Sequence, residues 1–233
     1  VAVVSFLNSY LNDENENTVV HSLQKIGFKT VIGSAQIHPF IKWLPRCESS
    51  VLEGYLNPTL EQYLHNIKEG LGENGQLLIM NSAGGLIGQE QYRAIDSLLS
   101  GPAGGMVGAS TVAKRAGLAQ TINLDMGGTS TDVSRFSGCL SYQSSVQVGE
   151  AKLAGLALHI ETVAAGGGSI CRVESGRLKV GPESSSAYPG PACYGFGGPL
   201  CLTDVNLLLG RLDARTFATP IEINSAQRKL NEW

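Results

Sequence analysis

The stretch Asp125–Asp132, with the sequence DMGGTSTD, constrains the fold of this chain more than any other part of it. Residues 121–124 before it are predicted to form a short buried strand, and residues 131–136 alternate like a second strand. A glycine-rich turn between two strands exposes backbone N–H groups, and such concavities bind anions. A Cβ at Gly127 or Gly128 is expected to block positive φ and close approach to a ligand. The hairpin therefore predicts phosphate binding, although the same residue types also form ordinary tight turns.

Side chains of the same stretch add polar groups to the predicted site. The hydroxyls of Thr129 and Thr131 can donate to phosphate oxygens, and Ser130 lies between them. Asp125 and Asp132 are predicted to hold a hydrated Mg²⁺ beside the phosphates, because Mg²⁺ is commonly bound by one or two carboxylates together with phosphate oxygens. The hairpin alone thus indicates a site for a nucleoside triphosphate.

Glycine clusters elsewhere strengthen this interpretation. Glycine makes up 29 of 233 residues, and it gathers at residues 84–85, 101–108, 127–128, 166–168 and 190–198. Clusters between apolar segments indicate several tight backbone turns. The formal net charge of −3 and the lack of a basic stripe argue against nucleic acid as a partner.

Composition also bounds the environment of the chain. No apolar run approaches the roughly 18 residues of a membrane span, and the sequence begins on an apolar, strand-like segment without Met. This beginning suggests that the chain was cut from a longer protein. Five cysteines form no C-x-x-C pair, which is typical of a reduced, cytoplasmic protein.

Periodicity predicts an α/β fold with a mostly parallel sheet. Strands are expected at residues 1–8, 28–34, 77–81 and 159–163, and a hairpin over 170–180 turning at Ser175–Gly176. Helices are expected at residues 13–27, 46–70 (with Pro58 starting a new helix or kinking this one), 106–115 capped by Gly117, and after Thr203–Asp204 up to Gly210. Residues 137–158 give only a weak pattern, and residues 189–198 are expected to form an ordered loop or a flap.

Five motifs in order resemble the A subunit or A domain of the hydantoinase/5-oxoprolinase family. They are SGPAGG at 100–105, DMGGTSTDVS at 125–134, TVAAGGGS at 162–169, VGPES at 180–184 and PGPACYG at 189–195. The resemblance extends from Val1 to about Phe217 and implies an incomplete actin/Hsp70/sugar-kinase-like (ribonuclease H-like) ATPase fold. It divides the chain into a remnant of an N-terminal ATPase lobe (residues 1–35), a hydantoinase A-type core domain (36–217) and a C-terminal segment (218–233).

The resemblance implies an ATP-dependent cyclic-amide hydrolase of the 5-oxoprolinase or hydantoinase type that phosphorylates the amide oxygen before ring opening. ATP and Mg²⁺ would be its cofactors, and 5-oxoproline or a hydantoin-like ring its substrate. A hydantoinase B-type subunit or domain would be the partner, in an oligomeric enzyme. Two alternatives stay open, namely a subunit of an ATP-dependent ketone carboxylase and a non-catalytic nucleotide-binding remnant.

The resemblance also assigns the site residues. Asp125 and Asp132 would be the catalytic and metal-binding carboxylates. Gly104 and Gly105 would open a helix whose N-terminus faces anionic oxygens. The remaining nucleotide contacts would come from Gly127, Gly128, Thr129, Ser130, Thr131, Gly166, Gly167, Gly168 and Ser169.

Two departures from the family pattern, and one cysteine within a matching motif, qualify these assignments. Members begin with another Asp-x-Gly-Gly-Thr-x-x-Asp hairpin, whereas this sequence contains the pattern once, so the isolated chain is expected to bind ATP weakly and to be inactive. His159 occupies a position where members carry Asp, and it is interpreted as a core histidine instead of a ligand. Cys193 has no His near it in sequence, which favours a structural role over a nucleophilic one.

Overall fold

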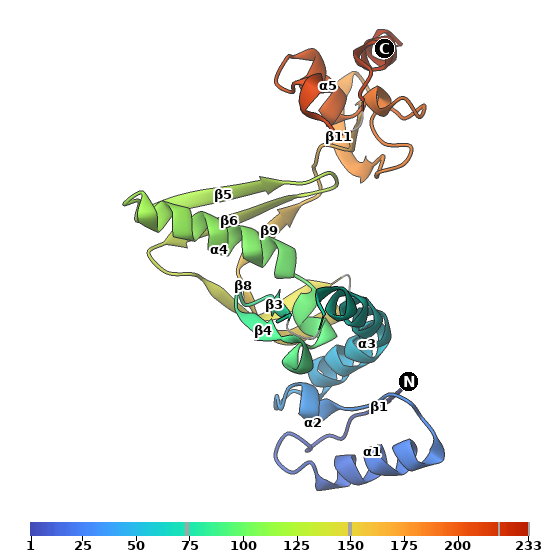
Figure 1. Ribbon diagram of the computed structural model, residues 1–233, viewed down its shortest axis with the longest axis vertical. Helices are drawn as coiled ribbons and strands as arrows, with labels where there is room; N and C mark the ends of the chain where they lie inside the picture. The colour runs from blue at the N-terminus through green and yellow to red at the C-terminus, as the bar shows by residue number, and fades with distance from the viewer. Residues whose placement is uncertain (73–74, 149–150, 219, 233) are drawn as a thin grey trace. The chain divides into compact units, whose positions relative to one another are not determined.

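A computed structural model describes residues 1–72, 75–148, 151–218 and 220–232, which leaves positions 219 and 233 of the expected C-terminal segment outside the described residues (Figure 1). The chain forms two units, each with its own internal packing. Unit 1 consists of Val1–Thr121 and Phe136–His159, and unit 2 of Ile122–Arg135 and Ile160–Trp233.

Unit 1 carries the long helices. Its α-helices are α1 (Glu14–Ile26), α2 (Ser34–Ile37), α3 (Trp43–Leu71) and α4 (Ser100–Arg115), and its 3₁₀ turns are η1 (Gln89–Gln91) and η2 (Ala94–Ser97). Gly27 ends α1 in the left-handed conformation (φ 109°), as its C-terminal glycine predicts. Pro58 lies inside a continuous α3, so the expectation of a new helix at that residue is wrong.

The strands of unit 1 form three two-stranded ladders. They are β1 (Ala2–Val4) with β2 (Val31–Gly33), β3 (Leu78–Met80) with β4 (Leu86–Gly88), and β7 (Tyr142–Val148) with β8 (Ala151–Leu158). The first pair is parallel and the other two are antiparallel. The hairpin of β7 and β8 lies in the region whose sequence gave only a weak pattern.

Apolar side chains and one buried charge network hold unit 1 together. Ile32, Ile37, Ile95 and Leu153 form a buried cluster that joins β2, α2, η2 and β8. Arg46 of α3 is fully buried, and its Nε donates to Ser34 Oγ at 3.0 Å. The same hydroxyl donates to Glu16 Oε2 of α1 at 2.9 Å. Ser34 therefore links two buried, oppositely charged side chains.

Unit 2 contains the glycine-rich segments. Its strands are β5 (Gln120–Met126) and β6 (Thr131–Ser137), whose outer ends are assigned to unit 1, together with β9 (Ile160–Val163), β10 (Ser169–Glu174) and β11 (Arg177–Ser184). Its helical elements are η3 (Ala192–Tyr194), α5 (Leu202–Leu208), η4 (Ala214–Thr216) and α6 (Ile223–Asn231). Cys193, Leu207 and Ala226 form its buried cluster, which joins η3, α5 and α6.

Two sheets organise unit 2. One has the strand order β5-β6-β9, and β5 and β6 run side by side as two long ribbons in Figure 1. The other is the hairpin of β10 and β11, which turns at Ser175 (φ 50°) and Gly176 (φ 74°), as predicted. Two successive residues with positive φ are typical of the type I′ turn that joins two-residue hairpins.

The expectation of a mostly parallel sheet is wrong for the strand pairs whose register is described. Of these only β1–β2 is parallel, whereas β3–β4, β6–β9, β7–β8 and β10–β11 are antiparallel. For β3–β4, β7–β8 and β10–β11 the reason lies in the short connections, since a parallel crossover needs about a dozen residues or more. The expected burial of residues 121–124 is also wrong, because Ile122 and Leu124 on edge strand β5 are 73% and 68% exposed.

Candidate phosphate-binding turn

The turn between β5 and β6 is the exposed tip of the predicted hairpin. Residues 127–130 connect the two strands, and the Gly127 N–H donates to Ser130 O at 2.9 Å. Asp125 lies one residue before the end of β5 and Asp132 one residue after the start of β6. The two carboxylates therefore flank the turn symmetrically on neighbouring strands.

A second glycine segment, residues 166–168, packs directly against this turn. The Gly167 N–H donates to Gly127 O at 2.9 Å, and the Gly168 N–H donates to Gly128 O at 2.6 Å. A Cβ on Gly166 would lie 2.7 Å from Gly127 O, which is closer than real Cβ contacts. These glycines are required because two backbones meet there without room for side chains.

The two hydrogen bonds set the direction of the donors in the turn. In a trans peptide the C=O and N–H groups point in opposite directions, and the peptides of the turn are trans. Because the carbonyls of Gly127 and Gly128 point toward residues 166–168, the N–H groups of Gly128 and Thr129 point away from them. Both residues are exposed. The turn thus directs two successive N–H groups outward, a geometry that suits an anion.

The reason given for Gly127 and Gly128 needs correction. Neither has a positive φ, and a Cβ on Gly128 would have no atom within 4 Å. Strain therefore does not require glycine at these two positions. Close approach between two backbones requires glycine at Gly166 and Gly168, whereas close approach of Gly127 and Gly128 to a ligand stays a prediction.

The hydroxyls predicted to bind phosphate divide into two groups. Thr131 is buried and its Oγ1 donates to Ala165 O at 2.5 Å, and Ser169 is fully buried with its Oγ accepting the Gly166 N–H at 2.9 Å. These two hydroxyls serve internal bonds. Thr129 is exposed, so its side chain is accessible to a ligand, and Ser130 is half-buried.

The carboxylates fit a magnesium ion in their chemistry. Asp125 is exposed on β5, and Asp132 Oδ1 accepts the Thr162 Oγ1 hydrogen at 2.6 Å, which leaves its other oxygen for a ligand. Carboxylate oxygens are hard ligands of the kind Mg²⁺ prefers. Within the described ranges no group of three or more His, Cys, Asp or Glu residues is arranged to hold a metal. An ion here would therefore be held by two carboxylates, phosphate oxygens and water.

The first turn of α5 supports the glycine segment from behind. Both the N–H and the Oγ1 of Thr203 donate to Gly167 O, each at 2.8 Å. Asp204 is fully buried and accepts the N–H groups of Ala192, Cys193 and Cys201 at 3.0, 2.8 and 2.7 Å. From the sequence, Thr203 and Asp204 were predicted only to cap the start of this helix, whereas the N-cap residue is Cys201. The one sequence feature that could have indicated these supporting contacts is the Thr-Asp pair that follows a glycine-rich loop.

The structural role predicted for Cys193 agrees with its surroundings. Its side chain is fully buried, and burial together with the Asp204 carboxylate raises the pKa of this thiol to about 12. Since the thiolate is the nucleophile, such a group is inert near neutral pH. Cys201 lies nearby, and burial raises the pKa of its thiol to about 11.

Two other predicted positions differ in the structure. Helix α4 begins at Ser100, so Gly104 and Gly105 lie in its second turn and do not open it. Pro102 fits within the first turn because the N–H groups there have no partner inside the helix. His159 is exposed between β8 and β9, and its backbone N–H donates to Ser141 O at 2.9 Å. Its interpretation as a core histidine is therefore wrong.

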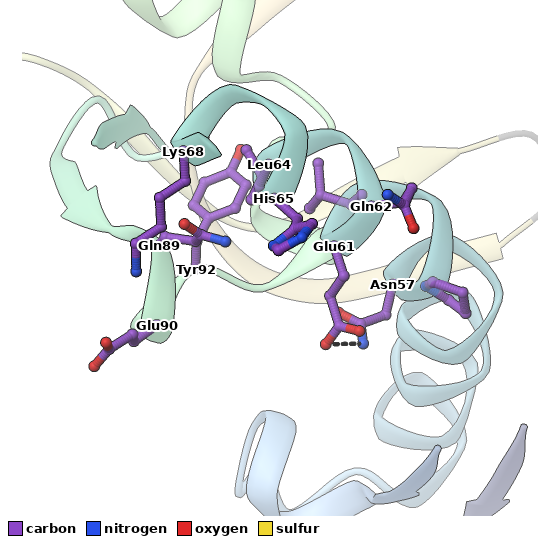
Figure 2. Close-up of a pocket in the computed structure, with 11 residues that line it drawn as sticks. Asn57, Glu61, Gln62, Leu64, His65, Lys68, Gln89, Glu90 and Tyr92 are labelled. Atoms are coloured by element: carbon purple, nitrogen blue, oxygen red, sulfur yellow. Dashed lines mark hydrogen bonds between the residues drawn. The ribbon is translucent and has the colours of Figure 1, made fainter. Parts of the chain in front are cut away.

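A separate pocket of about 580 Å³ lies in unit 1. Figure 2 shows it between α3 and the segment that follows β4, with Asn57 and Glu61 joined by a hydrogen bond of 2.9 Å. Its lining is mostly polar and includes Lys68 and Tyr92. It contains none of the predicted site residues, so it is distinct from the turn.

None of the described helices is both long enough and apolar enough to span a membrane.

Comparison with known proteins places the chain among enzymes with related folds. The 5-oxoprolinase of Saccharomyces cerevisiae is 43% identical over 218 residues, which cover 92% of this chain and 17% of that protein. A nucleotide-free structure of acetone carboxylase matches with a TM-score of 0.81 and 26% identity, over 99% of this chain and 34% of that one. The ATP-dependent caprolactamase of Pseudomonas jessenii matches with a TM-score of 0.77 and 29% identity, over 99% and 35%.

These matches establish the fold and the family. The chain has the mixed α/β, actin-like ATPase fold that it shares with both solved enzymes. It spans 17–20% of the length of the fungal and Dictyostelium 5-oxoprolinases that it matches. The profile of the family described as Hydantoinase/oxoprolinase matches residues 46–232. The chain therefore belongs to the hydantoinase/oxoprolinase family.

Proposed function

We propose that this chain is part of an ATP-dependent cyclic-amide hydrolase of the 5-oxoprolinase type, in which the turn at residues 127–130 binds phosphate. The observation that carries the proposal is the outward direction of the Gly128 and Thr129 N–H groups between Asp125 and Asp132. Preorganised N–H donors stabilise developing negative charge during phosphoryl transfer. Family membership supports the same assignment.

The chemistry explains why such an enzyme needs ATP. An amide carbonyl is a poor electrophile, and transfer of the γ-phosphoryl group to the amide oxygen turns that oxygen into a good leaving group. Water adds to the activated carbon, the C–N bond breaks as the nitrogen takes up a proton, and a second water releases phosphate from the resulting acyl phosphate to leave the carboxylate. The turn would hold phosphate oxygens in line for the transfer. Mg²⁺ bound by Asp125 and Asp132 would neutralise phosphate charge.

A cyclic amide is the preferred substrate class. The 5-oxoprolinase relative is 43% identical to the chain, whereas acetone carboxylase is 26% identical over a comparable length. 5-Oxoproline and a hydantoin-like ring both contain the amide that this chemistry activates. The ketone carboxylase alternative is less well supported, because its evidence is the more distant match.

The remaining assignments stay proposals. We place a hydantoinase B-type subunit or domain beside this one, within an oligomeric cytoplasmic enzyme. Five unpaired cysteines support a reducing compartment. The boundaries at residues 35 and 217 also stay predictions. Nucleotide contact by Gly104, Gly105 and residues 166–169 also stays a proposal. Because Gly166, Gly168 and Ser169 are buried, we propose that these three support the turn and do not touch the nucleotide themselves.

The test is an assay of the complete protein that contains this chain, together with its B-type component. ATP hydrolysis should require a cyclic amide, and one ADP should form for each ring opened. 5-Oxoproline, hydantoin and caprolactam are compared with acetone plus bicarbonate. Turnover only with the ketone and bicarbonate would refute the proposal in favour of a carboxylase. No nucleotide turnover or binding would favour a non-catalytic remnant.

A further inference from the structure

The contacts of Thr203 point to a role for α5 in the geometry of the phosphate-binding turn. Thr203 is half-buried in the first turn of this helix. Its N–H and its Oγ1 hydrogen converge on one acceptor, the carbonyl oxygen of Gly167, each at 2.8 Å. A Cβ on Gly167 would lie 2.7 Å from Thr203 Oγ1, so glycine is needed for this contact.

The peptide that contains the Gly167 carbonyl continues the connection to the turn. Its N–H, which belongs to Gly168, donates to Gly128 O at 2.6 Å. Because that bond fixes the peptide between Gly128 and Thr129, it also fixes the direction of the Thr129 N–H. Three distant parts of the sequence thus form one chain of hydrogen bonds, from Thr203 through the Gly167–Gly168 peptide to the turn.

Helix α5 is a suitable support because its own first turn is held on several sides. Asp204 binds three backbone N–H groups, including that of Cys201 at the helix start. Leu207 packs in the buried cluster of unit 2. Thr203 therefore projects from a fixed element, and its hydroxyl restricts the position that the Gly167 carbonyl can take.

We propose that Thr203 is a positioning residue that acts through the Gly167–Gly168 peptide to orient the Thr129 N–H toward the phosphate of ATP. This inference rests on the proposed function, since the turn must bind phosphate for the orientation to matter for turnover. Thr203 itself does not touch the nucleotide in this scheme. Its contribution is to hold a donor in the geometry that phosphoryl transfer needs.

The first experiment measures positioning without nucleotide. In the complete protein, Thr203→Val removes the hydroxyl while keeping the shape of the side chain. Loss of one neutral hydrogen bond, typically about 1 kcal/mol, should speed amide exchange at Gly167 and Gly168 roughly fivefold. Thr203→Ser should exchange at the wild-type rate. Thr18→Val is the matched control, because exposed Thr18 in α1 donates only within its own helix, to Glu14 O at 2.8 Å.

The second experiment measures turnover on the same variants. Thr203→Val should lower kcat for ATP about fivefold or more while KM for the amide substrate stays within twofold, and Thr203→Ser should restore kcat. If Thr203 had only a structural role, Thr203→Val would lower the melting temperature without lowering kcat selectively over KM, and Thr203→Ser would not restore kcat. If Thr203→Val does not fold, Thr203→Ala removes the hydroxyl without placing a methyl group against Gly167.

The two experiments separate failure of this inference from failure of the proposed function. Wild-type exchange rates in Thr203→Val would overturn the inference, and so would faster exchange with unchanged kcat. Absence of ATP turnover in the wild-type protein would refute the proposed function. In that case the exchange rates at Gly167 and Gly168 alone decide whether Thr203 positions the turn.

Discussion

Replacement of Asp204 should loosen one loop of unit 2 selectively. The carboxylate is fully buried, with Oδ2 accepting the N–H groups of Ala192 and Cys201 and Oδ1 accepting that of Cys193. In Asp204→Asn one oxygen becomes an NH₂ group, which cannot accept a hydrogen bond. At least one of the three N–H groups is then left buried without a partner.

The size of the effect follows from this count. A buried N–H without a partner costs about 1–3 kcal/mol. Asp204→Asn should therefore speed exchange of the affected amide by about 5- to 150-fold. Asp204→Ala leaves the N–H groups of Cys193 and Cys201 unpaired, whereas that of Ala192 keeps its bond to Pro199 O at 3.0 Å. We expect a loss of about 2–4 kcal/mol, below the simple sum because the loop can relax.

Hydrogen exchange followed by mass spectrometry on peptides covering residues 190–201 measures this change in the complete protein. Iodoacetamide labelling at pH 8 gives a second readout, because Cys193 should become reactive only in Asp204→Ala. The matched control is Asp213→Asn, since Asp213 is exposed and pairs with Arg215. Wild-type exchange and labelling in Asp204→Ala would refute the idea that this carboxylate organises the loop.

Three further predictions concern other contacts. Gly128→Ala should leave the melting temperature unchanged but raise KM for ATP several-fold, because the new Cβ would face open space where phosphate is proposed to bind. Gly166→Ala should instead lower the melting temperature, because its Cβ would lie 2.7 Å from a backbone oxygen. Burial raises the pKa values of Cys193 and Cys201 to about 12 and about 11, above the ordinary 9.0. The folded state therefore keeps these thiols protonated at a pH where the unfolded chain ionises them, so folding stability is constant below pH 9 and falls as the pH rises above 9. The fall is up to about 1.4 kcal/mol per pH unit for each thiol, until the pH reaches that thiol's folded-state pKa. Denaturant unfolding between pH 8 and 10.5 should show this decline, and alanine at both cysteines should flatten it. Arg46→Lys should destabilise unit 1 by about 2–4 kcal/mol in the same assay, because an ammonium group cannot reproduce the planar fork that is buried there.

Features encoded by neighbouring residues were predictable from the sequence. The β5–β6 hairpin, the turn at Ser175–Gly176 and the glycine after α4 each depend on a few consecutive residues. Gly117 has a φ of 73° and follows α4 as a C-terminal glycine should. The order of glycine motifs likewise identified the family, because several specific turns had to occur together.

Features that depend on contacts between distant segments were not predictable. Gly166 is required by Gly127, which lies 39 positions earlier, and no local pattern reveals that approach. The roles of Thr203 and Asp204 depend on loops that only the fold brings to α5. His159 lies beside an apolar strand in sequence, yet it falls at the exposed junction between two strands. Propensity therefore located many of the elements, although not the β7–β8 hairpin, and packing decided which polar groups stay exposed.

ATP hydrolysis by Asp125→Ala tests the central claim most directly, because this exposed carboxylate flanks the turn and has no role in the buried cores. ADP release is measured on the complete protein with its best cyclic amide, beside wild type and Asp213→Ala. We predict a fall in kcat of at least about 100-fold, as for loss of a group that stabilises transition-state charge, with an unchanged melting temperature. ADP release within twofold of wild type would contradict the assignment of the turn as the phosphate site.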